Sequence, residues 1–314
     1  MSMPDDYLKY PARRYGMDHD RYEWSDFFER KPVAWPHGAR IAFSVVTHVQ
    51  HFPLDMPAKP FKAPGALMMP YPDFRYYTNR DYGNRVGIFR ILKLLQEKNL
   101  HTSFAVNAIV ADRYPALIKA IVADGHEIVA HGYDMGKVHH SGLTAEDEAV
   151  LITGSLEALR KVSGQAVRGW LSPGRAQSFN TPDLLAAQGV DYCFDWANDD
   201  LPYEMRTNNG SLLAMPLAYE TDDRVAADEY FHSEPEWVQQ IKDRFDVLYR
   251  ESATQGGRVM SLPLHSWVSG MPYRVEYLRE ALDYILSHKG VWTASSQQIC
   301  AAFRAQTQDC DRGR

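Results

Sequence analysis

The sequence predicts an α/β protein in which helices surround a parallel β-sheet that curves into a barrel. Apolar segments of strand length alternate with amphipathic segments of helix length about seven times. The alternation has no linker, internal repeat or low-complexity segment, so one barrel fits 314 residues better than two open sheets. Several of the apolar segments end in histidine or acidic residues, and ligands bind at the carboxyl ends of strands in such sheets.

The first half of the chain contains three strands and three helices after an N-terminal arm. Residues 1–38 are rich in tyrosine, proline and charge and show no clean period, so they form an arm. The strands are expected over 41–46, 103–106 and 127–130, and the helices over 84–98, 112–124 and 144–162. Residues 53–82 are rich in proline and are expected to form a long loop that is either functional or a contact with a second subunit.

The second half continues the alternation to the end of a single catalytic domain. The expected strands are 167–171, 190–196, 212–217, 258–264 and 291–294. The expected helices are 180–189, 234–251, 275–288 and 296–304. These limits predict a barrel over residues 39–305 and a C-terminal tail over residues 306–314.

Composition excludes several classes of function. Hydrophobic residues make up 45% of the chain and charged residues 24%, as in ordinary globular proteins. The net charge is −6 and no run of lysine and arginine is longer than two residues, which argues against nucleic acid as a partner. Three distant cysteines, Cys193, Cys300 and Cys310, argue against a disulfide framework or a thiolate zinc site. No segment is apolar enough for a signal peptide or a membrane span, so we expect a cytoplasmic protein that binds no membrane.

Three histidines at strand ends are the main candidates for catalysis, namely His51, His131 and His265. Neutral imidazole can act as a general base or bind a metal ion. Alternation along the first strand puts His48 and Gln50 on one face and His51 on the other, and we favour His51 over His48 as the functional residue. His265 directly follows an apolar strand and is the candidate general acid for a leaving nitrogen.

A metal site is a weaker prediction. Such a site needs at least three protein ligands, and His51 and His131 with His139 or His140 would supply them. Met135, four residues after His131, offers only a thioether, which binds hard or borderline metals poorly. Solvated loop positions are the favoured interpretation of His139 and His140. A metal is therefore either absent or a divalent ion such as zinc at His51 and His131.

Other strand ends carry polar or aromatic residues that suit substrate binding. Arg175 could hold a carboxylate or carbonyl group, and Asp199 or Asp200 could orient a histidine. The remaining candidate substrate-binding residues are Gln50, Trp170, Glu220 and Trp267.

Several of these segments, in this order, resemble the polysaccharide deacetylase-like (NodB-homology) superfamily, and within it the allantoinase-like branch. The resemblance extends from about Trp35 to Ile299. It is carried by Gly38-Ala39-Arg40-Ile41-Ala42, Arg80-Asp81-Tyr82-Gly83-Asn84-Arg85-Val86-Gly87, Ala130-His131-Gly132, Arg168-Gly169-Trp170, Asn198-Asp199-Asp200-Leu201-Pro202-Tyr203, Leu264-His265 and Val291-Trp292. The resemblance implies a distorted (β/α)7-type barrel that hydrolyses C–N amide bonds.

The resemblance also implies roles for individual residues. In metal-dependent members the first motif carries two aspartates, a base and a metal ligand, and their counterparts here are Gln50 and His51. The second motif carries two histidines four residues apart, matched here by His131 and Met135. The histidine of the last motif, the usual general acid, matches His265. The chain then either works without metal, as the allantoinases of this branch are thought to, or uses an altered site.

Together these features predict a hydrolase of non-peptide C–N bonds in linear or cyclic amides or ureides, working as a homo-oligomer. In this scheme His51 or His131 activates water, His265 protonates the leaving nitrogen, and Arg175 with Trp170 holds the substrate. One alternative is a metal-dependent N-deacetylase of an acetylated sugar. Another is a non-catalytic protein that binds a sugar or ureide, because Gln50 stands where the base is expected.

Overall fold

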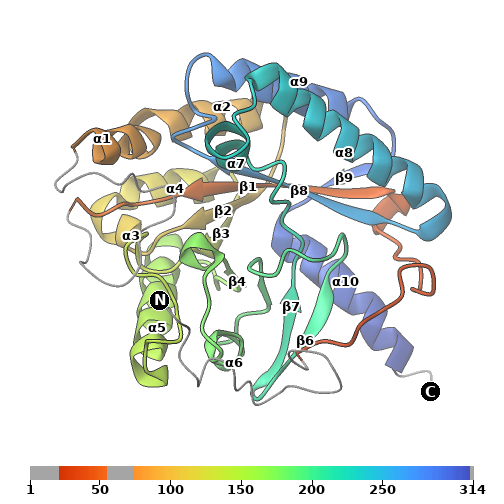
Figure 1. Cartoon of the computed structure of the whole chain (residues 1–314), viewed down its shortest axis with the longest axis horizontal. Coiled ribbons are helices and arrows are strands. Elements are labelled where there is room, and N and C mark those ends of the chain that lie inside the picture. The colour runs from red at the N-terminus through yellow and green to blue at the C-terminus, as the bar shows by residue number, and fades with distance from the viewer. Residues whose placement is uncertain (1–20, 55–73, 312–314) are drawn as a thin grey trace.

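The computed structural model describes residues 21–54 and 74–311, which form one curled sheet with helices on its outer side (Figure 1). Within these residues the sheet has nine strands. They are β1 (Ile41–Val49), β2 (Ser103–Val106), β3 (Glu127–Ala130), β4 (Gly169–Trp170), β5 (Tyr192–Cys193), β6 (Tyr203–Thr207), β7 (Gly210–Ala214), β8 (Arg258–His265) and β9 (Val291–Thr293).

The strand order is β6-β7-β5-β4-β3-β2-β1-β8, and every neighbouring pair is parallel except the β6–β7 hairpin. The short strand β9 pairs with the first three residues of β1. The two edges of the sheet approach each other, because the Val259 N–H of β8 donates to the Asp200 carbonyl (3.2 Å) just before β6. The Ser261 hydroxyl likewise donates to the Pro216 carbonyl (2.7 Å) just after β7. This curled, almost closed sheet confirms the predicted distorted barrel.

Helices surround the sheet: α8 lies along β1 and β8, α9 beside α8 and α5 beside β3 on its outside, and α10 packs against its inner face (Figure 1). They are α1 (Phe74–Tyr82), α2 (Ile88–Glu97), α3 (Ile109–Arg113), α4 (Pro115–Ala123), α5 (Ala145–Ser163), α6 (Thr181–Ala187), α7 (Asp223–Asp228), α8 (Glu234–Gln255), α9 (Arg274–Leu286) and α10 (Ser296–Asp311). Local sequence explains two helix starts. The Thr144 hydroxyl accepts the Asp147 N–H at the start of α5, and Ser233 forms a capping box with Glu236 at the start of α8.

Strand alternation divides the core into an outer and an inner part. On β1, Ile41, Phe43 and Val45 pack outward with residues of the covering helices. Ala42 and Val46 face inward and pack with Ile299 and Cys300 of α10. Because side chains alternate along a strand, His48 and Gln50 belong to the inner face that Ala42 and Val46 share. The inner face therefore leads from the α10 end of the barrel to the carboxyl ends of its strands.

The same alternation turns the other strand-end histidines inward. On β3 Val129 packs in the inner core, so His131 two residues later lies on that face. On β8 Val259 is an inner residue whereas Leu262 and Leu264 pack outward, so His265 is also inward. Three histidines from three strands thus converge inside one end of the barrel.

The structure differs from the sequence expectations at several element boundaries. Residues 74–82, expected as part of a loop, form α1, and the π-helical turn Gly83–Gly87 joins it to α2. The helix expected over 112–124 is two helices that break at Tyr114, because Pro115 disfavours a helical residue before it. The strand β6 was not predicted. The last helix runs to Asp311, so the segment expected to be a tail from 306 is helical as far as that residue.

The described part of the N-terminal arm packs against the barrel. Trp35 is buried, and its indole N–H donates to the Arg258 carbonyl (2.9 Å). Arg21 forms an ion pair with Asp183 at 2.7 Å. The rest of the predicted arm, residues 1–20, and most of the predicted proline-rich loop, residues 55–73, lie outside the described residues. A membrane-crossing helix, long and apolar enough for that purpose, does not occur in the described part of the chain.

Candidate active site

A cavity of about 220 Å³ opens where the carboxyl ends of β1, β3 and β8 meet. His48 near the end of β1, His131 directly after β3 and His265 at the end of β8 all line it. Arg175 reaches it from the turn after β4, and Asp222 from the start of α7. The cavity therefore gathers groups that carry protons and charge from five segments that are distant in sequence.

His265 is held by the carboxylate of Asp223. The ring Nδ1–H of His265 donates to Asp223 Oδ1 (2.8 Å), and its backbone N–H lies 2.9 Å from Oδ2. The same carboxylate accepts the backbone N–H of Ser269 (3.2 Å) and its hydroxyl (2.5 Å). With a proton on Nδ1, the lone pair of the neutral ring lies on Nε2. Asp223 thus fixes both the tautomer and the orientation of His265.

Asp222 stands beside this pair as the N-cap of α7. Its Oδ1 accepts the backbone N–H groups of Arg224 (3.0 Å) and Val225 (3.1 Å), and it lies 3.6 Å from His265 Nδ1. Burial, together with the charge of neighbouring Asp223, raises the pKa of Asp222, although the positive charge of His265 opposes the shift. Two adjacent carboxylates therefore face one histidine, and only Asp223 receives its ring proton.

His48 is buried, and neither of its ring nitrogens has a hydrogen-bond partner among the described residues. Its ring lies 4.3 Å from that of His265 and 5.3 Å from that of His131, measured between centroids. Burial, followed by the repulsion that a protonated His48 would meet from protonated forms of His265 and His131, lowers the pKa of His48 well below its ordinary value. His48 is therefore neutral near pH 7, and both nitrogens are left to meet a ligand.

His131 belongs to a separate chain of hydrogen bonds. Its Nδ1–H donates to the Leu171 carbonyl (2.8 Å), so Nε2 accepts the side-chain N–H of Gln50 at 3.2 Å. The Gln50 carbonyl oxygen in turn accepts the indole N–H of Trp267 (3.3 Å). Burial lowers the pKa of His131 to about 4. Gln50, which has no proton-accepting carboxylate, thus serves to hold a neutral His131.

These contacts test whether a metal ion fits the positions that the family resemblance implies. At those positions the amide N–H of Gln50 points at His131 Nε2, and Met135 packs against Phe52 and Tyr76. His51 is not among the residues that line the cavity, and its Nε2 pairs with Arg113 at 3.0 Å. An amide donor and a thioether are poor ligands for a divalent cation. These residues therefore do not fit a deacetylase metal centre.

A different set of donors fits an ion better. Among the described residues, His48, Asp222 and His265 are the one group of three potential ligands whose donor atoms lie within 4.8 Å of one another. His48 has no other partner, whereas His265 has already committed Nδ1 to Asp223. A histidine whose second nitrogen is bonded to a carboxylate is a common arrangement at metal sites. The set of His48, Asp222 and His265 therefore fits a divalent ion better than the positions that the family resemblance implies.

Four of the sequence-predicted residues line the cavity, namely His131, His265, Gln50 and Arg175. Trp267 joins them through its bond to Gln50. His51 does not, because the residue lies on the outward-facing side of the β1 alternation, where Val49 also packs. The proposed metal pair of His51 and His131 is therefore corrected, since the two rings bind different partners.

The other predicted site residues lie elsewhere. Trp170 is part of the outer core and donates its indole N–H to the Ser172 hydroxyl (2.9 Å), so it does not hold a substrate in the cavity. Glu220 and Asp200 both pair with Arg244. Asp199 pairs with Arg30 at 2.7 Å. None of these three carboxylates is bonded to a histidine, and the structure places Asp223 in the orienting position predicted for Asp199 or Asp200.

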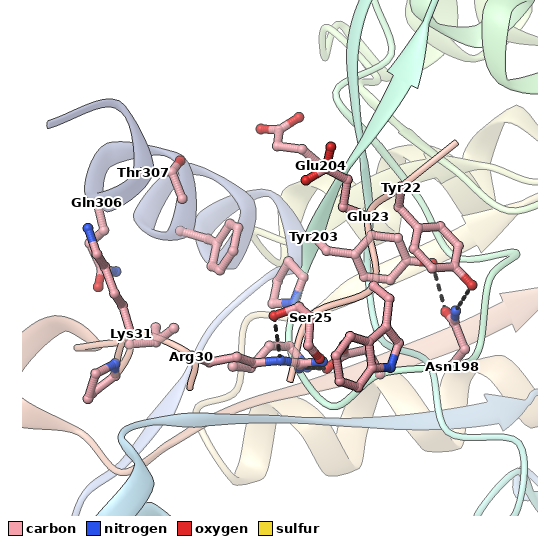
Figure 2. Close-up of a pocket in the computed structure, with 17 residues that line it drawn as sticks. Tyr22, Glu23, Ser25, Arg30, Lys31, Asn198, Tyr203, Glu204, Gln306 and Thr307 are labelled. Atoms are coloured by element: carbon pink, nitrogen blue, oxygen red, sulfur yellow. Dashed lines mark hydrogen bonds and ion pairs between the residues drawn. The ribbon is translucent and has the colours of Figure 1, made fainter. Parts of the chain in front are cut away.

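Asp199 instead lines a larger groove of about 900 Å³ between the N-terminal arm, the loop before β6 and α10. Figure 2 shows this groove, in which Asn198 bonds to Tyr22 and Arg30 bonds to Ser25. It lies toward the start of β8, since Asp200 bonds to Val259, whereas His265 ends that strand. The larger groove is thus remote from the histidines.

Sequence reasoning missed His48, Asp222 and Asp223 as leading candidates. The signal for His48 was present in the alternation of β1, where the inward positions are the small residues Ala42 and Ser44. The sequence signal for Asp223 was weaker, because the pattern Thr221-Asp222-Asp223 is typical of an acidic turn before a helix and does not indicate a catalytic role. Asp223 reaches His265 only because α7 packs against β8 in the folded chain.

Comparison with known proteins finds similarity to polysaccharide deacetylases. Residues 73–193, which include His131 and Arg175, match the family model described as polysaccharide deacetylase. A Schizosaccharomyces pombe protein named "Putative polysaccharide deacetylase" is 29% identical over 310 residues, covering 88% of this chain and 95% of that protein.

Two solved structures extend the similarity over nearly the whole chain. The crystal structure of Puue allantoinase has a TM-score of 0.79 and 28% identity, covering 90% of this chain and 98% of that one. The "probable Polysaccharide deacetylase" of Pseudomonas aeruginosa PAO1 has a TM-score of 0.78 and 29% identity, with the same coverage. Residues 73–193 thus match the polysaccharide deacetylase family, and over most of its length the chain is similar to proteins named polysaccharide deacetylase and to an allantoinase.

Proposed function

We propose that this chain hydrolyses a non-peptide C–N bond in a small amide, cyclic amide or ureide. The observation that carries the proposal is the Asp223–His265 pair, which shares a cavity of about 220 Å³ with His48, a ring that has no hydrogen-bond partner among the described residues. The cavity is smaller than the roughly 300–1,000 Å³ of pockets for drug-sized ligands, so it suits a small molecule better than a polymer chain. The similarity to Puue allantoinase supports the same class of bond.

His265 can carry the proton in both directions. Its Nε2 takes a proton from water as the water oxygen forms a bond to the carbonyl carbon, and Asp223 stabilises the resulting imidazolium. When the tetrahedral intermediate collapses, the C–N bond breaks and the same proton moves from Nε2 to the leaving nitrogen. The products are a carboxylic or carbamic acid and an amine or amide, and His265 returns to its neutral form.

His48 and His131 contribute as neutral groups. Their lowered pKa values keep both rings uncharged near pH 7, so they do not repel the imidazolium that forms on His265. His48 is in ring contact with His265 and has two nitrogens without partners, so it can orient the attacking water. Gln50 cannot take a proton and is assigned to hold His131.

The second candidate is a metal-dependent N-deacetylase of an acetylated sugar. It is favoured by the His48, Asp222 and His265 donor set and by the match of residues 73–193 to the polysaccharide deacetylase family model. A divalent ion bound there would polarise a carbonyl group and lower the pKa of bound water to about 7. In that case His48, Asp222 and His265 would hold the ion, and Asp223 would orient His265 through its bond to Nδ1.

The homo-oligomeric state and the cytoplasmic location of the protein stay predictions.

A hydrolysis screen tests the proposal. Purified protein would be incubated with small amides, cyclic amides, ureides and N-acetylated sugars, and the released amine or acid would be quantified. His265→Gln keeps the size of the side chain but cannot carry the proton, and His232→Gln, a histidine bonded to Gln240 outside the cavity, is the control. Activity lost only in His265→Gln supports the proposal.

Two results would contradict the proposal. Full activity of His265→Gln would show that another group carries the proton. Stabilisation of the wild type by a compound that it does not cleave would instead favour the alternative of a non-catalytic protein that binds a sugar or ureide.

A further inference from the structure

Arg175 has a backbone conformation that a non-glycine residue adopts at a cost. Its φ is +55°, in the left-handed region, and it follows Gly174, whose φ is +66°. Such a conformation is strained for a residue other than glycine, and it clusters at functional sites. The turn Pro173–Arg175 thus positions the Arg175 side chain at a cost in stability. The acid–base scheme of the proposed hydrolysis gives this side chain no role.

The guanidinium group is fixed at one nitrogen and unpartnered at another. The backbone N–H of Arg175 donates to the Ser172 carbonyl (2.8 Å), and Nη1 donates to the Leu217 carbonyl (3.1 Å). The ring of Tyr219 lies 5.4 Å from the guanidinium carbon. Nη2 is buried and has no hydrogen-bond partner among the described residues. A buried charged donor without an acceptor is costly, which indicates that a ligand supplies the acceptor.

The neighbouring charges do not satisfy Nη2. Asp195 already accepts hydrogen bonds from the Ser172 N–H and hydroxyl and from Gln177. Asp222 caps α7, as described above, and Arg224, the other arginine at the cavity, pairs with Glu229 at 3.0 Å. The positive charge of Arg175 also acts on both His48 and His131, so it lies close to the centre of the site. It is a preorganised positive group that lines the same cavity as His265.

We propose that Nη2 of Arg175 binds the oxygen of the scissile carbonyl group and stabilises the negative charge on that oxygen when water adds. This inference rests on the proposed hydrolysis. As the water oxygen bonds to the carbonyl carbon, the π-electron pair moves to the carbonyl oxygen, which then faces the guanidinium. The pair returns when the C–N bond breaks. Fixed donors that meet a developing oxyanion are worth about 10²–10³-fold in kcat.

Kinetics of Arg175 variants with the best substrate of the screen test the assignment. We expect Arg175→Met to lower kcat about 10²–10³-fold with little change in KM, because the contact strengthens in the transition state. Arg175→Lys, which keeps the charge but loses the planar fork, should fall between Met and wild type. Added guanidinium chloride at millimolar concentration should restore part of the activity of Arg175→Met. Arg244→Met, which removes an arginine paired with Asp200 and Glu220, is the matched control and should show neither effect.

Binding of methylphosphonate, a tetrahedral oxyanion, gives a second readout that needs no turnover. Calorimetry should show binding to wild type and to His265→Gln, weaker binding to Arg175→Lys and a loss of at least tenfold in affinity in Arg175→Met. Thermal melting of each variant would establish that it is folded, and Arg175→Lys replaces Arg175→Met if the latter does not fold.

The outcomes separate this inference from the proposed function. If the wild type hydrolyses nothing in the screen but binds methylphosphonate through Arg175, the proposed function fails and the oxyanion site stands. If hydrolysis is found but Arg175→Met, or Arg175→Lys in its place, raises KM without lowering kcat, the inference is overturned and the proposed function stands. Equal binding of methylphosphonate by wild type and the folded Arg175 variant would also overturn it.

Discussion

The carboxylate of Asp223 accepts both the ring Nδ1–H of His265, at 2.8 Å, and its backbone N–H, at 2.9 Å. The ring and the backbone of one residue are thereby tied to one acid. Because Asp223 begins α7 and His265 ends β8, this contact also joins the helix to the strand. Ser269 adds two further hydrogen bonds to the same carboxylate, so the acid is fixed independently of His265.

Asp223→Asn should reduce kcat by about 10²–10⁴-fold with little effect on KM. The amide keeps the size of the side chain, but its NH₂ group favours a lone pair on Nδ1 and so shifts the proton of His265 to Nε2. Steady-state kinetics would measure the change, with Asp228→Asn at the other end of α7 as the control. Equal losses in the two variants would show that the effect comes from the helix rather than from the tautomer.

Any divalent ion that the purified protein holds tightly should depend on His48 and Asp222, not on His131. In the described part of the chain neither ring nitrogen of His48 has a partner, whereas both nitrogens of His131 are already bonded. Elemental analysis after dialysis against zinc or cobalt would compare His48→Ala and Asp222→Asn with His131→Ala. With cobalt, the visible spectrum would report the ligands directly. An ion retained in His48→Ala and lost in His131→Ala would place the metal at the position that the family resemblance implies.

The free energy of unfolding should fall as the pH is lowered from 7 toward 5, with part of this loss due to His131. Burial lowers the pKa of folded His131 from 6.5 to about 4, so between these values the unfolded chain binds a proton that the folded chain does not. Stability is thus present above pH 6.5 and is lost progressively down to pH 4. The difference between the unfolded and the folded pKa of His131 corresponds to about 3 kcal/mol in total.

Urea denaturation at pH 7, 6 and 5 would measure the slope, and His131→Gln should flatten it. Buried acids such as Asp222 and Asp195, whose pKa values are raised, act in the opposite direction, so the comparison is between variant and wild type. An unchanged slope in the variant would mean that His131 does not contribute. His232→Gln is the control, since that histidine lies outside the cavity.

The fold and part of the site followed from local patterns. Apolar runs of four to nine residues located β1, β3 and β8, and the histidines at or after their ends were recognised because ligands collect there. The choice between His48 and His51 depended on which face of β1 looks inward. Alternation separates the two residues, but it does not say which face is covered by helices and which by α10.

The orienting acid could not be found from local patterns. Asp199, Asp200 and Asp223 all stand in acidic segments near strand ends, and nothing within those segments ranks them. The difference arises from position in the barrel. The segment of Asp199 and Asp200 meets the beginning of β8, whereas that of Asp223 meets its end. Pairing between distant strands decides which carboxylate reaches His265.

Gly132→Ala should destabilise the protein by about 1–3 kcal/mol and lower activity, through strain next to His131. Gly132 has a φ of +63°, and a Cβ atom there would lie 2.5 Å from Pro173 Cγ, so both the backbone and the packing resist it. Gly164→Ala is a matched control, because Gly164 also has a positive φ, +70°, but a Cβ atom would meet nothing within 4 Å. Both variants carry the backbone cost, and only Gly132→Ala adds the clash with the turn that presents Arg175. Thermal melting should therefore show the larger loss for Gly132→Ala, and kinetics should show a lower kcat in that variant alone. Equal melting temperatures and equal activity in the two variants would mean that Pro173 yields to the methyl group and that the turn does not set the geometry of the site.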